Sequence, residues 1–217
     1  MKKRDDNPKK KPDPEQQPGT VERIQKAALD EFAEYGLEGG RIDRIAQRAQ
    51  VNKAMIYYHF KSKNELYTEV LRSFYLQIGS RAREDLDRSE TLEEALLKLA
   101  TLHAEVVLNN PQARPLILRE MASPNPEVLK AIVESMRASG IPQRIVEILK
   151  QELSLGGVRA IDPRHVVTTF IGMSIGYFAF APLTNQLVGV TDVRGFIKER
   201  PPIIVDIFLN GLKTEQK

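Results

Sequence analysis

The sequence has no cysteine, no tryptophan and only three histidines among its 217 residues. The lack of cysteine excludes disulfide scaffolds, thiolate metal sites and cysteine nucleophiles. The histidines, His59, His103 and His165, are too few for us to expect a polyhistidine metal site. We therefore expect neither a metal nor a cofactor.

Catalytic motifs are also missing from the long segment 72–217. It contains no glycine-rich phosphate loop, no His-Glu-x-x-His and no Gly-x-Ser-x-Gly. Because no nucleophile or acid–base constellation is recognisable either, we expect that the chain is not an enzyme. An all-α enzyme remains as an alternative from a different class.

Strand patterns with a period of two are absent, whereas apolar residues recur at three- and four-residue spacing from Thr20 onward. This spacing predicts an all-α fold. Gly36 is expected to end the first helix, Ser62 and Asp162 to cap later ones, and Pro201-Pro202 to break or restart the last. Helices beyond the one that Ser62 opens are expected near 91–110, 112–122, 126–139, 142–155, 163–188 and 193–213.

The segment 1–18 contains only charged, amide and proline residues after Met1, so it has nothing with which to build a core. It also lacks the apolar stretch of a secretory signal, and we expect a cytoplasmic protein. A solvated, disordered tail is the favoured interpretation. A basic arm that touches DNA phosphates is the alternative.

One stretch is long and apolar enough to raise the question of a membrane. Val166–Thr191 carries no charged residue and exceeds the ~20 residues that span a bilayer. However, it includes several threonines, Asn185 and Gln186, and no basic cluster flanks it. We expect a helix buried in a core or between two subunits, and no membrane partner.

Positive charge is concentrated in one short region, although the formal net charge of the whole chain is only +3. Segment 41–63 has six basic residues against one acidic residue, whereas 20–40 has two against five. Two short helices joined by Ala49–Asn52 lie in the basic region and predict a helix-turn-helix. Side chains that can donate to phosphate follow at 57–59, so the pattern favours docking in the major groove of DNA.

These residues also carry a family resemblance. Over about 20–71 the chain resembles the TetR (tetracycline repressor) family through five pieces, IQKAALDEF at 24–32, YG at 35–36, IAQRA at 45–49, VN at 51–52 and IYYHFKSKNEL at 56–66. The resemblance implies a homodimeric transcriptional regulator, usually a repressor, that a small-molecule effector releases from a palindromic operator in double-stranded DNA. It divides the chain into a DNA-binding domain at 19–63 and a helical ligand-binding and dimerisation domain at 64–217.

The family pattern assigns roles to individual side chains. Lys53 and Ala54 would face base edges at the start of the recognition helix, while Tyr57, Tyr58, His59 and Lys63 would hold the phosphate backbone. The expected DNA contacts are thus Arg41, Lys53, Ala54, Tyr57, Tyr58, His59 and Lys63. Alternatives remain: Tyr57 as a core aromatic, Lys61 as a solvated charge, and Asn52 as a helix cap rather than a base reader.

Two positions depart from the family pattern. Gly40 stands where a capping threonine is common, so a hydroxyl contact to phosphate is lost. Gln50 stands where the turn usually has glycine, and a left-handed backbone there would cost about 1 kcal/mol relative to glycine. Neither departure removes the DNA-binding prediction.

In the second half, three polar residues are candidates for ligand contact: His103, Arg119 and Tyr177. Each has a plainer interpretation, namely a core histidine, a surface Arg119–Glu120 pair, and an aromatic face in the core or at a dimer seam. The scarcity of acidic clusters favours a neutral or anionic ligand. The helix that runs from Ser62 to about Leu86 is the expected lever between the domains. A ligand-independent, nucleoid-associated DNA binder remains the alternative function.

Overall fold

The computed structural model describes residues 19–111, 113–156 and 158–213. Over these residues it contains ten α-helices: α1 (Thr20–Gly39), α2 (Ile42–Ala49), α3 (Lys53–His59), α4 (Lys63–Asp87), α5 (Leu92–Asn109), α6 (Ala113–Ala122), α7 (Pro126–Ala138), α8 (Ile141–Ser154), α9 (Pro163–Leu187) and α10 (Val193–Leu212). The described part has no strand, only one isolated bridge, so the all-α prediction is confirmed. The predicted tail, 1–18, lies outside the described residues.

Side-chain caps start two helices where the sequence predicted them. Ser62 Oγ accepts a hydrogen bond from the Glu65 backbone N–H at 3.0 Å and opens α4. Glu65 Oε2 in turn accepts from the Lys61 N–H at 2.9 Å, which ties the preceding turn to the same helix. Asp162 Oδ1 accepts from the Arg164 N–H at 2.9 Å and opens α9.

The prediction that Pro201-Pro202 breaks the last helix is wrong, because α10 continues through both prolines. Each proline removes a backbone donor and crowds the preceding turn, which costs about 3 kcal/mol in a helix interior. Apolar residues on both sides of them are buried: Ile197, Ile204, Val205, Phe208 and Leu209. Packing of these turns, largely against α5, therefore outweighs the local cost.

Gly36 interrupts the first helix where the sequence predicted that it ends, because its φ of +68° and ψ of −177° are not helical. A short second helical stretch follows this kink and reaches Gly39. A side chain at position 36 would collide with Arg119, since a Cβ would lie 2.0 Å from Arg119 Nη1. The backbone conformation requires glycine here, whereas the Arg119 guanidinium is the end of a flexible side chain and can move aside.

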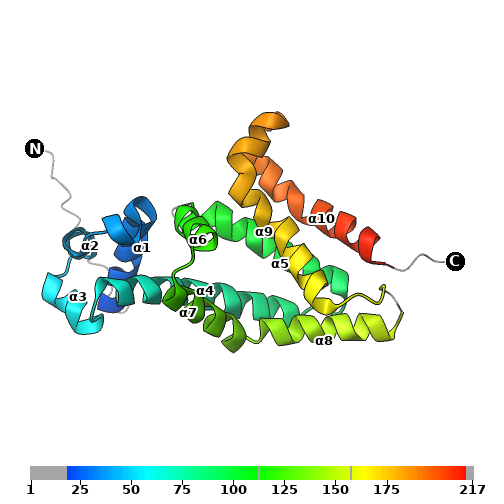
Figure 1. Ribbon diagram of the computed structural model, residues 1–217, viewed down its shortest axis with the longest axis horizontal. Helices are drawn as coiled ribbons and strands as arrows, with labels where there is room; N and C mark the ends of the chain where they lie inside the picture. The colour runs from blue at the N-terminus through cyan, green and yellow to red at the C-terminus, as the bar shows by residue number, and fades with distance from the viewer. Residues whose placement is uncertain (1–18, 112, 157, 214–217) are drawn as a thin grey trace, which may run out of the picture.

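Two apolar cores organise the molecule. The first core joins buried residues of α1, α2 and α3 to the opening turns of α4, and includes Leu116 of α6 and Val128 of α7. The second core lies among α4, α5, α8, α9 and α10. Figure 1 shows α1–α3 at one end of the molecule and α4 running from them along the base of the larger helical part. The first core continues past position 63 to Leu71, so α4 is shared between the two parts.

Helix α9 is long and apolar enough to cross a membrane, but only 28% of its most apolar window is buried within the chain. Its buried residues form a single stripe: Val166, Phe170, Ser174, Phe178, Ala181 and Asn185. Large apolar side chains remain exposed elsewhere on it, including Phe180 at 64% and Leu187 at 74%. The sequence predicted that this helix is buried in a core or between two subunits. Within one chain, the core buries only one face of α9.

Candidate DNA-binding surface and ligand cavity

The turn between α2 and α3 has the geometry of a helix-turn-helix. Gln50 adopts a left-handed conformation, with φ 54° and ψ 46°, although glycine is usual at this position of the family pattern. Asn52 caps α3, because its Oδ1 accepts a hydrogen bond from the Met55 N–H at 2.7 Å. The prediction that Asn52 acts as a cap is therefore confirmed, and the cap satisfies a backbone donor at the start of α3.

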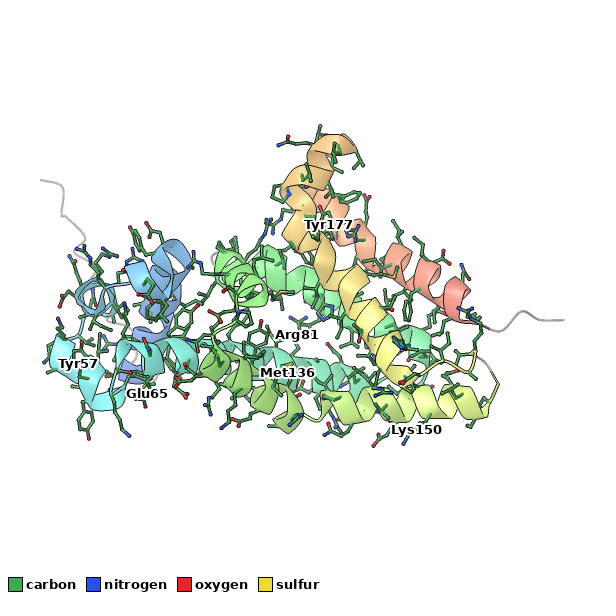
Figure 2. The ribbon with its side chains drawn as sticks, viewed as in Figure 1. Tyr57, Glu65, Arg81, Met136, Lys150 and Tyr177 are labelled. Carbon is green, nitrogen blue, oxygen red and sulfur yellow. The ribbon has the colours of Figure 1, made fainter. Side chains whose placement is uncertain are left out.

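Helix α3 packs into the first core through one buried residue, and its other side chains face the solvent. Ile56 is its only buried residue, and Phe60 is buried directly after the helix. Tyr58 is 82% exposed and Tyr57 is 45% exposed, so the alternative of Tyr57 as a core aromatic does not hold. Figure 2 shows Tyr57 on α3, at the end of the molecule away from α9 and α10. Lys53, Ala54 and His59 are exposed on the same helix, and the surface of α3 is thus free to dock.

Arg44 and Arg48, two of the six basic residues of 41–63, form ion pairs with carboxylates of the first helix. Arg44 Nε donates to Glu31 Oε1 at 2.6 Å, and its guanidinium lies 4.1 Å from the centre of the Tyr35 ring. Arg48 donates to Glu34 Oε2 at 3.1 Å. Glu31 is completely buried and also accepts from the Arg41 N–H at 2.9 Å. These pairs join α2 to α1, so Arg44 and Arg48 stabilise the unit.

Sequence reasoning missed this role of Glu31. It was counted only as one of the acidic residues of 20–40. The available signal was its phase, since Glu31 follows Ala27 by four residues and precedes Phe32 on the apolar side of α1. A carboxylate in that position requires a basic partner from another helix.

The expected DNA-contacting lysines have partners within the chain. Lys53 Nζ forms a 2.9 Å ion pair with Asp43 Oδ1 across the turn, which raises the lysine pKa. Lys63 Nζ donates to the carbonyls of Glu38 at 3.2 Å and Gly40 at 3.3 Å, at the end of α1. The Arg41 side chain is exposed beside them. An exposed ion pair is weak, so Lys53 can exchange Asp43 for a nucleic acid at little cost.

A cavity of about 250 Å³ lies between α4, α5, α6, α7, α8 and α9. His103 lines it, beside apolar residues that include Leu99, Val106 and Phe170. His103 Nδ1 is buried and has no hydrogen-bond partner among the residues that the structure describes. Burial lowers the pKa of the imidazole to about 4, so His103 is neutral at physiological pH.

The other two predicted ligand contacts lie outside this cavity wall. Arg119 is exposed on α6 and rests on Gly36 of α1. The hydroxyl of Tyr177 donates to Asn185 Oδ1 at 2.9 Å, and the Arg200 guanidinium lies 4.1 Å from the centre of its ring. Figure 2 shows Tyr177 in the upper half of α9, below its last turns. The structure thus places only His103 of the three in the cavity.

Helix α6 touches both the cavity and the DNA-binding unit. Ile117 and Met121 line the cavity, whereas Leu116 is completely buried in the first core. One helical turn after Leu116, Glu120 is also buried and accepts a 2.5 Å hydrogen bond from the hydroxyl of Tyr67 on α4. Helix α6 thus connects the cavity wall to the core around the helix-turn-helix.

Comparisons with known proteins agree with this architecture. Residues 24–70 match the model of the bacterial regulatory proteins of the tetR family. The HTH-type transcriptional regulator RutR of Escherichia coli O157:H7 is 30% identical over 171 residues, which span 77% of this chain and 78% of RutR. This chain belongs to the tetR family. It is therefore a helix-turn-helix transcriptional regulator that binds DNA, as the sequence predicted.

Other members of the tetR family match over most of this chain. The HTH-type transcriptional repressor NicS of Pseudomonas putida is 26% identical over 175 residues, covering 72% of this chain and 82% of NicS. The crystal structure of the regulator FadR from Bacillus subtilis, solved in complex with stearoyl-CoA, superposes with a TM-score of 0.73. It covers 87% of this chain and 97% of FadR at 20% identity, which shows the shared fold.

Proposed function

We propose that this regulator represses transcription as a homodimer on a palindromic operator and that a small molecule entering the cavity releases it. The observation that carries the proposal is the double contact of α6, with Ile117 and Met121 on the cavity and Leu116 in the core of the DNA-binding unit. FadR of Bacillus subtilis, which shares the fold, binds stearoyl-CoA, and NicS is named as a repressor. As a DNA-binding regulator the protein would act in the cytoplasm.

On DNA, α3 would lie in the major groove. Lys53 and Ala54 at its first turn would meet base edges, the lysine as a donor to guanine and the alanine against a thymine methyl. Tyr57, Tyr58 and His59 would donate hydrogen bonds to phosphate oxygens of the DNA backbone, and so would Arg41 and Lys63. The exposure of α3 and the basic charge of its surroundings support this assignment.

Dimerisation would bury the apolar surface that α9 and α10 leave open. Phe180, Leu183 and Leu187 of α9 and Ile203 and Ile207 of α10 are all more than half exposed. A Cβ at Gly172 or Gly176 would meet nothing within 4 Å, so this side of α9 has room for a closely packed second helix. A two-fold interface built from the same surface on each protomer places two α3 helices on one palindromic site.

Release would follow from a change in the separation of the two recognition helices. Helices of a dimeric helix-turn-helix protein must sit about 34–36 Å apart, or a multiple of this, to enter successive major grooves. The ligand must prefer the released form by about 10⁴-fold, or ~5.5 kcal/mol, to move the population from 99:1 to 1:99. Displacement of α6 by a cavity ligand would shift α4 and the first core together, because Leu116 and Tyr67 belong to that core.

The proposal is tested by selecting operator DNA from a random pool and then screening a metabolite library for release in a gel-shift assay at two salt concentrations. We expect an inverted repeat, two protomers per duplex, and release by at least one compound. A single half-site bound tightly by a monomer would contradict the dimer. Binding that no compound reverses would favour the ligand-independent DNA binder instead.

A further inference from the structure

The wall of the cavity is almost entirely hydrocarbon. Of the 23 residues that line it, 21 are aliphatic, phenylalanine or methionine, and the two others are Tyr75 and His103. No lysine, arginine, aspartate or glutamate is among them. A charged group placed inside would lose its hydration without gaining a partner of opposite charge. The wall therefore discriminates against ions of either sign.

The two polar groups in the wall are uncharged near neutral pH. Burial lowers the pKa of His103 to about 4. Burial, and to a smaller extent the negative charge of Glu120, raises the pKa of Tyr75 to about 12. A neutral imidazole has one donor and one acceptor nitrogen, and a phenol both donates and accepts. His103 Nδ1 is buried with no partner in the described part of the chain. Leaving such an atom unpaired costs free energy, which a ligand hydroxyl or carbonyl would recover.

The volume of the cavity limits the size of its occupant. An apolar cavity of about 150 Å³ holds benzene, with six non-hydrogen atoms. By proportion, a cavity of about 250 Å³ holds on the order of ten. Entry is possible between α6 and α9, because the lining residues Met121 and Ile171 are also exposed to solvent.

We propose that the effector is an uncharged, mainly apolar molecule of about ten non-hydrogen atoms with a single hydroxyl or carbonyl that hydrogen-bonds to His103. This inference rests on the proposed function, since it names the ligand class of the same cavity. It narrows the expectation from the sequence, because an anionic group has no counter-charge in the wall.

Three probes of equal chain length test the class: 1-octanol, octanoate and octylammonium. Their binding to the full chain is measured by calorimetry, and the same samples are then tested for release of the selected operator. We expect 1-octanol to bind at least about tenfold more tightly than either ion, because only the ions must be desolvated without a partner. Equal or tighter binding of octanoate or octylammonium would overturn the proposal, as would no binding of 1-octanol.

Variants locate the binding and the hydrogen bond. His103→Leu keeps the cavity apolar but removes the polar group, and we expect about fivefold weaker binding of 1-octanol. Val106→Phe fills the space one turn from His103 and should abolish binding. His165→Leu, an exposed histidine outside this cavity, should leave the affinity unchanged. Unaltered affinity in both His103→Leu and Val106→Phe would overturn the assignment.

The two proposals fail in different ways. If 1-octanol binds in the cavity but the operator stays bound, the proposed ligand class is supported and the proposal that a cavity ligand releases DNA is contradicted. If a library compound releases the operator while 1-octanol does not bind, the proposal of ligand-induced release is supported and the proposed ligand class is contradicted.

Discussion

The hydroxyl of Tyr67 donates a 2.5 Å hydrogen bond to Oε1 of Glu120, and this buried pair joins α4 to α6. The Tyr67 ring also meets Phe32 of α1 edge to face, with centroids 5.0 Å apart. The second carboxylate oxygen, Glu120 Oε2, accepts from the Asn125 N–H at 3.1 Å, ahead of α7. The Glu120 carboxylate thus connects α4, α6 and the turn between α6 and α7.

Tyr67→Phe removes one hydroxyl and leaves Glu120 Oε1 buried without its donor. We expect the free energy of unfolding to fall by about 1–3 kcal/mol, because an unsatisfied buried acceptor keeps its desolvation cost. Denaturant titration measures the change, and the cycle with Glu120→Gln isolates the pair. Tyr35→Phe, which removes a hydroxyl from a 43% exposed tyrosine, is the matched control and should change stability little. Equal losses in Tyr67→Phe and Tyr35→Phe would show that the buried bond is unimportant.

Glu31→Gln tests the buried carboxylate between α1 and α2. The amide still accepts from the Arg41 N–H, but it loses the charge that holds Arg44. We expect a loss of about 1–3 kcal/mol in the free energy of unfolding and weaker operator binding, because the α2–α3 pair is held through Glu31. Glu34→Gln, at an exposed carboxylate that binds Arg48, serves as control with a small effect. A Glu31→Gln protein as stable as the wild type would refute this role.

Acid sensitivity follows from His103. In the unfolded chain its pKa is near 6.5, whereas burial lowers it to about 4 in the folded protein. Between these values the unfolded state binds more protons, so stability falls as the pH drops from 6.5 to 4, by about 3 kcal/mol in total from this group. We expect His103→Leu to lose correspondingly less stability over that range in denaturant titrations at several pH values, and His165→Leu to behave as wild type. Parallel curves for His103→Leu and wild type would count against the buried neutral state.

Lys53 and Lys63 are expected to act differently on DNA. Lys53→Ala should relax base preference at one operator position by about tenfold, since this side chain is assigned to a base edge. Lys63→Ala should weaken binding to all sequences and reduce the salt slope by about one, as expected for a phosphate contact. Asp43→Asn, which frees Lys53 from its ion pair, should raise affinity modestly. The assignment would be wrong if the two alanine variants had equal effects on operator and random DNA.

Local features were predictable from the sequence, and contacts between distant residues were not. The Asn52 and Ser62 caps follow from short-range rules, and the structure confirms both. The Tyr67–Glu120 bond joins residues 53 positions apart, and no spacing rule indicates it. The continuous α10 also depended on distant packing, because the local rule for Pro201-Pro202 predicts a break.

The same limit explains the ligand residues. His103, Arg119 and Tyr177 were chosen as polar side chains on apolar helices, which does not decide the direction in which each one points. His103 faces the cavity, but Arg119 faces Gly36 and Tyr177 packs with Arg200. The cavity belongs to six helices together, so its wall could be assigned only once their arrangement was known.

The distance between the two recognition helices tests the central claim most directly. The chain has no cysteine, so Lys61→Cys, at an exposed position just after α3 that is not among the assigned DNA contacts, introduces a single site for a spin label. Double electron–electron resonance on the labelled dimer would give that distance with operator DNA and with a compound that releases it. We predict one narrow distribution on DNA and a shifted or broader one with the compound. A distribution that the compound leaves unchanged while the operator is released would contradict the account.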